Sequence, residues 1–258
     1  MRKALAAISV LLLAACTGAE EVPPESPPEG ATAPVAMDYS AALADERRPE
    51  EDVARDEFRH PDAMMALAEL EPGDKIADLL PGGGYFTRVF ALAVGPEGVV
   101  YPVIRPEGVA GQYETPILPV AEEYPNVLMN RTPYDALAFP EPLDVVFTAQ
   151  NYHDMHIAEY NMGDPAGMNA TAFAALKPGG YYIVIDHSAP DDMPLEDALA
   201  LHRIQRQLVI DEVTAAGFVL DSESDAVRNP VDPRDVGVFD ESIRGHTDQF
   251  ALRFRKPE

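Results

Sequence analysis

The sequence predicts an α/β fold with a doubly wound, mostly parallel seven-stranded sheet whose last strand runs antiparallel. Three observations favour this class. Strand-like apolar segments alternate with helical segments along most of the chain. Residues 181–186 are apolar almost throughout, as in a parallel strand that is buried on both faces. The part from residue 41 onward has a suitable length for one domain with one core.

The first half of this expected domain supplies three strands and the helices between them. Proline and glycine mark the ends of helices, as Pro72-Gly73 and Gly95-Pro96 do here. The expected elements are a charged helical segment ending near residue 56, a helix at 61–70, a strand at 75–80, a helix at 85–94, a strand at 98–104, a helix at 111–123 and a strand at 126–130.

The second half continues the alternation and then changes direction. The expected elements are a strand at 143–148, a helix at 166–176, a strand at 181–186, a long helix at 194–216, and strands at 218–223 and 249–255. The last two strands have no helix between them and are expected to pair antiparallel. Ligands of such sheets bind outside the carboxyl ends of the parallel strands, near the point where the strand order reverses.

A glycine turn joins the first strand to the next helix. The run is Asp78-Leu79-Leu80-Pro81-Gly82-Gly83-Gly84, and Tyr85 follows at once. Backbone N–H groups at the start of a helix are available to an anion or a polar ligand. Glycine has no Cβ, so a ligand can lie directly on such a backbone. Asp78 lies near the strand's end, where a carboxylate can orient amines or hydroxyls.

This run resembles the cofactor turn of class I S-adenosylmethionine-dependent methyltransferases, Asp-x-Gly-x-Gly-x-Gly, with Leu80 in place of the first glycine. Residues 173–185 resemble the helix, tight turn and fifth strand of that family. The resemblance covers roughly residues 48–258. It is closest to a bacterial branch of often exported methyltransferases, marked here by Pro-Gly-Gly-Gly-Tyr, Asn-Tyr-His-Asp and Gly-x-Thr-Asp-Gln-Phe. It implies a Rossmann-like fold and transfer of a methyl group from S-adenosylmethionine to a small molecule.

The same resemblance implies which residues contact this cofactor. They are Asp78, Pro81, Gly82, Gly83, Gly84, Asp135 and Asn151. Asp135 follows the third strand, where the family contacts the adenine. An acid that caps a helix or stabilises a turn is an equal alternative for this residue. The family usually has an acid after the second strand for the ribose hydroxyls. Here Arg105 and Pro106 come first, and Glu107 is the nearest acid.

Polar side chains gather where the fourth and fifth strands end. Three of the six histidines, His153, His156 and His187, should meet there with Asp154 and Asp186. Histidine exchanges protons near neutral pH. His153 or His187 is therefore expected to act as the catalytic base, oriented by Asp154 or Asp186.

Three further residues are candidates for the substrate pocket. Tyr152 belongs to the cluster after the fourth strand. His202 and Arg203 lie in the predicted long helix, and the exported branch has a His-Arg pair in a similar place. The alternative for this pair is a solvated helix face.

Charge and composition constrain the partners and leave two other functions open. The formal net charge is −25 and no basic stripe exists, so nucleic acid is not an expected partner.

His153-x-x-His156 with Asp154, Asp186 and His187 offers ligands for a metal-dependent hydrolase, but no strong metal signature appears, and no metal is expected. A binding module without catalytic activity is the other alternative.

The N-terminus predicts export and a lipid anchor. Arg2 and Lys3 precede an apolar stretch at residues 4–15 that is too short to span a bilayer. Leu13-Ala14-Ala15-Cys16 resembles a lipoprotein processing box, with removal of residues 1–15 and lipidation of Cys16, the only cysteine. Thr17 at the next position favours the outer membrane in an organism that has one, and the expected location is periplasm-facing or outer-membrane. Residues 16–40 are rich in Pro and Glu and should form a tether to the domain at 41–258.

Overall fold

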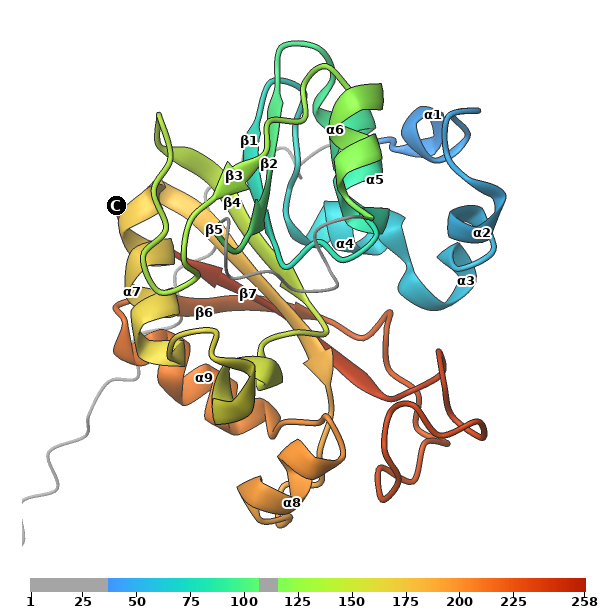
Figure 1. Ribbon diagram of the computed structural model, residues 1–258, viewed down its shortest axis with the longest axis vertical. Coiled ribbons are helices and arrows are strands. Elements are labelled where there is room, and N and C mark those ends of the chain that lie inside the picture. Colours follow the sequence, from blue (N-terminus) through green and yellow to red (C-terminus); the bar gives the residue numbers. More distant parts are fainter. Residues whose placement is uncertain (1–36, 107–115) are drawn as a thin grey trace, which may run out of the picture. The chain divides into compact units, whose positions relative to one another are not determined.

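A seven-stranded sheet forms the centre of the computed structural model, which describes residues 37–106 and 116–258 (Figure 1). The strand order is β3-β2-β1-β4-β5-β7-β6. All neighbouring strands pair in parallel except β7, which runs antiparallel to β5 and to β6. The predicted fold class is confirmed. The strands are β1 (Lys75–Leu79), β2 (Val99–Ile104), β3 (Asn130–Arg131), β4 (Leu143–Ala149), β5 (Leu176–His187), β6 (Val219–Ser224) and β7 (Gln249–Arg255).

The helices lie before, between and after these strands. Short helices dominate the N-terminal part, and two 3₁₀ turns follow β4. In order they are α1 (Ser40–Leu43), α2 (Glu50–Val53), α3 (Asp56–Arg59), α4 (Pro61–Leu67), α5 (Tyr85–Val94), α6 (Leu118–Glu123), η1 (His153–His156), η2 (Ala158–Tyr160), α7 (Pro165–Ala175), α8 (Leu195–Ala200) and α9 (Arg206–Ala215).

The sheet is buried on both faces because successive strand residues point to opposite sides. Ile76 of β1 joins a core cluster with residues of α4, α5 and α6, whereas the next residue, Ala77, joins a cluster with residues of α7 and α9. In the first cluster the rings of Phe90 and Phe147 meet edge to face at 4.8 Å. Such an aromatic pair contributes about 0.5–1.5 kcal/mol beyond burial. This packing fixes the strand ends that carry the polar residues.

The predicted long helix at 194–216 is wrong in one important respect, because it is two helices. α8 ends at Ala200 and α9 begins at Arg206. Between them, Ile204 is extended and bridges Ser188 in parallel, and its N–H donates to the carbonyl of His187. His202 has a φ of 55°, which a helix does not allow. His202 and Arg203 therefore lie in a turn that docks on the end of β5.

Other boundaries differ less. β3 covers only two residues, with a further single bridge between Val100 and Val127. α6 begins at Leu118, and residues 111–115 of the expected helix at 111–123 lie outside the described residues. Tyr39 is packed in the core, and its hydroxyl donates to backbone carbonyls. The packed part of the chain therefore begins before residue 41, the expected start of the domain. Cys16, most of the expected tether and Glu107 lie outside the described residues. Within the described ranges, no helix has both the length and the apolar character needed to cross a membrane.

Candidate functional site

A cavity of about 580 Å³ opens at the carboxyl ends of β1, β4 and β5. It lies where the strand order reverses between β1 and β4, the position at which open α/β sheets bind ligands. Its size is within the range of about 300–1,000 Å³ found for small-ligand sites. Residues of α3 and of the segment between β6 and β7 complete its wall. This cavity is the candidate site.

The turn after β1 forms one side of the cavity through Pro81, Gly82 and Gly83. A Cβ added to either glycine would meet no atom within 4 Å, so the backbone faces open space. Leu80, which replaces the first glycine of the motif, has a φ of 53°. That region costs a residue other than glycine about 1–2 kcal/mol. The backbone thus follows a course suited to glycine although the side chain is leucine.

Gly84 has a different place from the one expected of a cofactor-binding residue. It is not among the described residues that line the cavity. It is the N-cap of α5 with a φ of 80°, and a Cβ there would lie 2.8 Å from side-chain atoms of Ile117 and Val120. The missing side chain makes room for the segment that contains α6, not for a ligand.

Asp78 presents a buried carboxyl group to the cavity. The hydroxyl of Thr87 donates to its Oδ2 at 2.6 Å. Burial raises the pKa of Asp78 to about 7, and the hydrogen bond from Thr87 and the charge of Arg59 oppose that rise. Asp78 is therefore poised to ionise near neutral pH and to receive a cationic or hydroxyl group of a ligand.

Arg59, at the end of α3, was not expected from the sequence, because it lies between the charged helical segment that was expected to end near residue 56 and the helix expected at 61–70. It lines the cavity with Arg55, the N-cap residue of α3. Its Nη2 donates to Oε1 of Gln150 at 2.7 Å, and its guanidinium lies 4.6 Å from the ring centroid of Tyr85. Burial lowers the pKa of Arg59 to about 10, which still leaves it charged. It supplies a fixed cation suited to a carboxylate.

The structure does not place the side chain of Asp135 at the cavity, where an adenine contact was expected. Asp135 is half-buried, and it fills the space in front of Gly163, where a Cβ would collide with its carboxyl group. It is absent from the described lining, whereas its neighbour Tyr134 belongs to it, together with Arg105 after β2. Asn151 does line the cavity, and its Nδ2 donates to the carbonyls of Leu80 and Ala149, which ties the glycine turn to β4.

The structure brings His153 and Asp186 into direct contact. Nδ1 of His153 lies 2.8 Å from Oδ1 of Asp186, and the backbone N–H of His153 donates to Oδ2 at 2.7 Å. Both residues are buried. Burial opposes protonation of His153, but the carboxylates of Asp186 and Asp154 outweigh it and raise its pKa well above the usual range. Asp186 thus fixes the ring so that Nε2 faces away from it.

Asp154 and His202 meet this free edge of the His153 ring. Nε2 of His153 lies 3.1 Å from Oδ1 of Asp154 and 3.3 Å from Nδ1 of His202. His187 also lines the cavity, but its Nδ1 lies 2.7 Å from Oγ1 of Thr247. Burial lowers the pKa of His187 to about 3, so its ring is neutral and weakly basic.

Tyr152 and His156 point away from the cavity, which corrects the expected substrate role of Tyr152. Tyr152 is fully buried, and its hydroxyl donates to Oε2 of Glu212 at 2.9 Å and accepts from Asn169. Nε2 of His156 lies 3.2 Å from the same glutamate oxygen. These residues anchor η1 on α9, because their spacing along a helical turn places them opposite His153 and Asp154.

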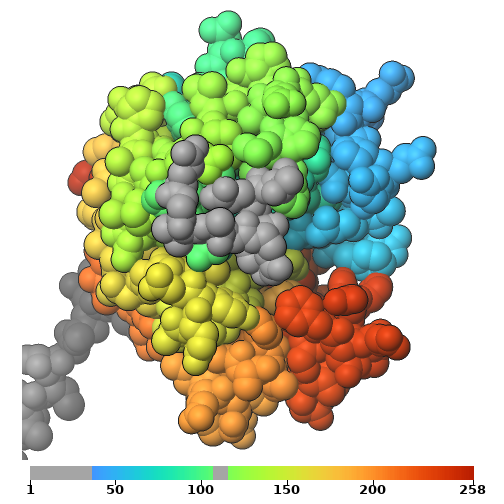
Figure 2. All heavy atoms as spheres, in the orientation of Figure 1, coloured from blue at the N-terminus to red at the C-terminus, as the bar shows by residue number. Residues whose placement is uncertain are grey.

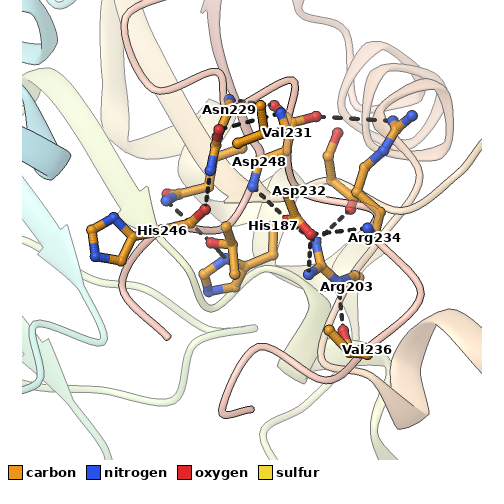
Figure 3. A network of polar contacts seen from close by, with 12 residues as sticks. His187, Arg203, Asn229, Val231, Asp232, Arg234, Val236, His246 and Asp248 are labelled. Atoms are coloured by element: carbon orange, nitrogen blue, oxygen red, sulfur yellow. Dashed lines mark hydrogen bonds and ion pairs between the residues drawn. The ribbon is translucent and has the colours of Figure 1, made fainter. Parts of the chain in front are cut away.

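Arg203 is likewise not a cavity residue in this arrangement. Its side chain is completely buried, and its Nη1 lies 2.9 Å from Oδ2 of Asp232 (Figure 3). It also donates to the carbonyls of Ser188 and Val236. These bonds join the turn between α8 and α9 to the segment before β7, and so hold the adjacent His202 at the cavity.

The segment between β6 and β7 closes the far side of the cavity, and no sequence signal marked the residues of it that line the cavity. Val238 and Phe239 from this segment line the cavity with Tyr160 and Met162. The ring of Phe239 is 61% exposed and lies 5.1 Å from that of His202. Figure 2 shows this segment (red) at the surface beside the atoms around α8 (orange). Together these residues give the end of the cavity with His153 and Asp154 an apolar border.

Comparison with known proteins agrees with the architecture. No family model matches the chain. Its sequence is 27% identical over 200 residues to the ubiquinone/menaquinone biosynthesis C-methyltransferase UbiE of Teredinibacter turnerae, covering 73% of this chain and 67% of that protein.

Solved structures show the fold. A SAM-dependent methyltransferase from Aquifex aeolicus matches with a TM-score of 0.56 at 18% identity, over 85% of this chain and 98% of that one. The N-methyltransferase NodS from Bradyrhizobium japonicum matches with a TM-score of 0.52 at 13% identity, over 78% of this chain and 96% of that one. The [4+2]-cyclase SpnF matches with a TM-score of 0.60 at 18% identity, over 83% of this chain and 85% of that one. The chain has the Rossmann-like fold of class I methyltransferases.

Proposed function

We propose that this protein transfers a methyl group from S-adenosylmethionine to a small-molecule acceptor. One observation carries the proposal: a single cavity joins the open turn of Pro81–Gly83 and the carboxyl group of Asp78 to the polar cluster around His153. The similarity to a C-methyltransferase and to methyltransferase structures supports the choice of donor.

The residues of one half of the cavity fit this donor. The bare backbone at Gly82 and Gly83 leaves room for an adenosyl group, and Asp78 can face its cationic or hydroxyl groups. Arg59 offers a charged partner for a carboxylate. When bound, the donor supplies an electrophilic methyl group on a sulfonium. Asp78, Arg59 and the glycine turn would then hold it in one orientation.

The other half of the cavity would receive the acceptor. We assign the base to His153, because Asp186 holds its ring and directs Nε2 toward Asp154 and His202. Because the pKa of His153 is raised, the ring must release its own proton before it can accept one from the acceptor, so transfer by this route should increase with pH. His187 is the poorer candidate, since its Nδ1 is engaged by Thr247. Alignment of the acceptor with the methyl group is the larger effect, and the walls of the cavity provide it.

Calorimetric titration of the full chain with S-adenosylhomocysteine tests the proposal. We expect the wild type to bind and Arg59→Met to lose about 10- to 100-fold in affinity, the scale of a charged hydrogen bond. Arg47→Met is the matched control, because Arg47 is half-exposed in an ion pair with Asp45 and is not among the described lining residues. A wild type that shows no binding at millimolar ligand would rule the proposal out.

A binding module without methyl transfer is the second candidate. The fold similarity to SpnF, whose name states a cyclase, shows that this architecture is shared with a different named activity. Binding of the donor without turnover of any acceptor in a broad small-molecule panel would favour this candidate.

We also propose that the protein is an exported lipoprotein, anchored by lipid at Cys16 and held by the tether at residues 16–40. The support is the Leu13-Ala14-Ala15-Cys16 box after a basic start and an apolar stretch. The full chain should fractionate with membranes in a bacterial host, and Cys16→Ser should release it or leave the leader uncleaved. Mass spectrometry of the mature N-terminus without lipid would contradict the proposal.

A further inference from the structure

The side chains of His153, Asp154 and His202 form a three-ligand cluster at the cavity, and we propose that it binds a divalent transition-metal ion. The ligand atoms are Nε2 of His153, Oδ1 of Asp154 and Nδ1 of His202, which lie within 4.8 Å of one another. Two imidazoles and one carboxylate are a ligand set typical of zinc or non-haem iron.

The distances between the three atoms have the size that a shared ion requires. They are 3.1 Å for His153–Asp154, 3.3 Å for His153–His202 and 3.6 Å for His202–Asp154. Ligand atoms about 2.1 Å from one ion are about 3.0 Å apart in octahedral geometry and about 3.4 Å apart in tetrahedral geometry. The triangle therefore accommodates an ion with only small movements of the side chains.

The surroundings hold the ligands in place, as the outer partners of metal sites do. Asp186 binds Nδ1 of His153 and leaves Nε2 as the ligand atom. The buried pair of Arg203 and Asp232 fixes the turn that carries His202. The side chains of His153, Asp154 and His202 are 3%, 18% and 25% exposed, so the cluster faces the cavity and not the bulk solvent.

This site differs from the metal ligands that the sequence suggested. His156, in the spacing His-x-x-His, instead contacts Glu212, and His187 contacts Thr247. The third ligand comes from the turn between α8 and α9, distant in sequence and expected to be helical. No short motif could therefore show the cluster.

Three protein ligands leave coordination positions open toward the cavity. If the proposed methyl transfer is correct, the ion favours one class of acceptor: a small molecule with a hydroxyl or phenol group. The acceptor oxygen would bind the ion and release its proton to water, because a divalent ion lowers the pKa of a bound hydroxyl. Its lone pair would then form the O–C bond as the C–S bond breaks and its electrons stay on sulfur. In this state His153 holds the ion and does not serve as the base.

The test uses the untagged full chain, stripped with a chelator and titrated with Zn²⁺ by calorimetry and with Co²⁺ by visible absorption. We expect one ion per chain and d–d bands of a site with nitrogen and oxygen ligands. His202→Ala and Asp154→Asn should each weaken binding at least 100-fold, and Asp186→Asn about 10- to 100-fold. His156→Ala is the matched control on η1 and should bind as the wild type does.

Wild type that binds neither Zn²⁺ nor Co²⁺ with one-to-one stoichiometry, or His202→Ala that binds as tightly as the wild type, would overturn the inference. His202 is partly exposed, so this variant should fold, and its thermal transition without metal should match that of the wild type. S-adenosylhomocysteine titrations on the same samples separate the two proposals. Metal binding without nucleoside binding would leave this site standing and reject the methyl transfer.

Discussion

Asp186 contacts His153 twice, through the ring Nδ1 and through the backbone N–H, and so locks the end of β5 to the start of η1. The backbone N–H of His187 donates to the same carboxyl group at 2.7 Å. A fully buried carboxylate with three donors holds the polar end of the cavity in one geometry.

Asp186→Asn keeps the shape but turns an amide toward these donors. We expect a loss of about 1–3 kcal/mol in the free energy of unfolding, the cost of unsatisfied buried groups. Urea denaturation measures it, with Asp211→Asn on the exposed side of α9 as a control that should stay within about 0.5 kcal/mol. Equal stability of both variants would contradict the role given to Asp186.

Gly84 and Gly83 form a matched pair of neighbours with opposite surroundings. Gly84→Ala places a Cβ 2.8 Å from Ile117 and Val120 in a backbone with a φ of 80°, so we expect a loss of about 1–3 kcal/mol. Gly83→Ala meets open space and should change stability by less than about 0.5 kcal/mol. Thermal and urea unfolding of both variants check this, and a larger loss for Gly83→Ala would refute it.

Leu80 tests the strain in the turn. Leu80→Gly and Leu80→Ala both remove the same half-buried side chain, but only glycine also relieves the φ of 53°. Glycine relieves the backbone strain but also gives the unfolded chain more conformational freedom, which lowers stability. The net expectation is that Leu80→Gly is more stable than Leu80→Ala by about 0.5–1 kcal/mol. The comparison needs only the two midpoints and slopes in urea. The reverse order would show that the leucine is unstrained.

Asp78 should make stability depend on pH. Its pKa is about 7 in the folded protein against an ordinary value of 3.8, so the folded state keeps the proton that the unfolded state has lost. The free energy of unfolding should therefore fall as the pH rises from about 4 to about 7, and the loss should level off above that.

Asp78→Asn removes this titration. The difference in free energy of unfolding between wild type and variant should decline across that window, as measured by urea unfolding at about one pH unit intervals. A difference that stays constant from about pH 4 to about pH 8 would mean that Asp78 titrates normally. The affinity for a cationic nucleoside ligand should rise over the same range in the wild type alone.

The sequence predicted the parts of this protein that obey local rules. The glycine turn, the helix at 85–94 and the antiparallel last strand pair follow from residue preferences and apolar period, and the structure has them. The break at residues 201–205 could not be predicted, since its cause is distant: Arg203 pairs with Asp232, and Ile204 bridges Ser188.

Within the site, the backbone turn and the meeting of His153 with Asp186 were predicted, but several partners were not. Strand order brings together the ends of β4 and β5, and this is readable from the pattern. Which way a side chain points after a strand ends is decided by tertiary packing. Tyr152 therefore turns into the core on Glu212, and Arg59 reaches the cavity from α3, which extends past the expected end of the charged segment.

The cavity gathers Arg55, Arg59 and Arg105 in a chain with a formal charge of −25. The net charge therefore attracts cations over long distances in water, whereas the three arginines offer an anionic group a local attraction at the cavity. A zwitterionic solute with excess positive charge should be attracted by the net negative charge of the chain. The arginines should orient it so that its carboxylate enters the cavity first. Added salt should slow such encounters, because screening within about 10 Å removes both the pull and the torque.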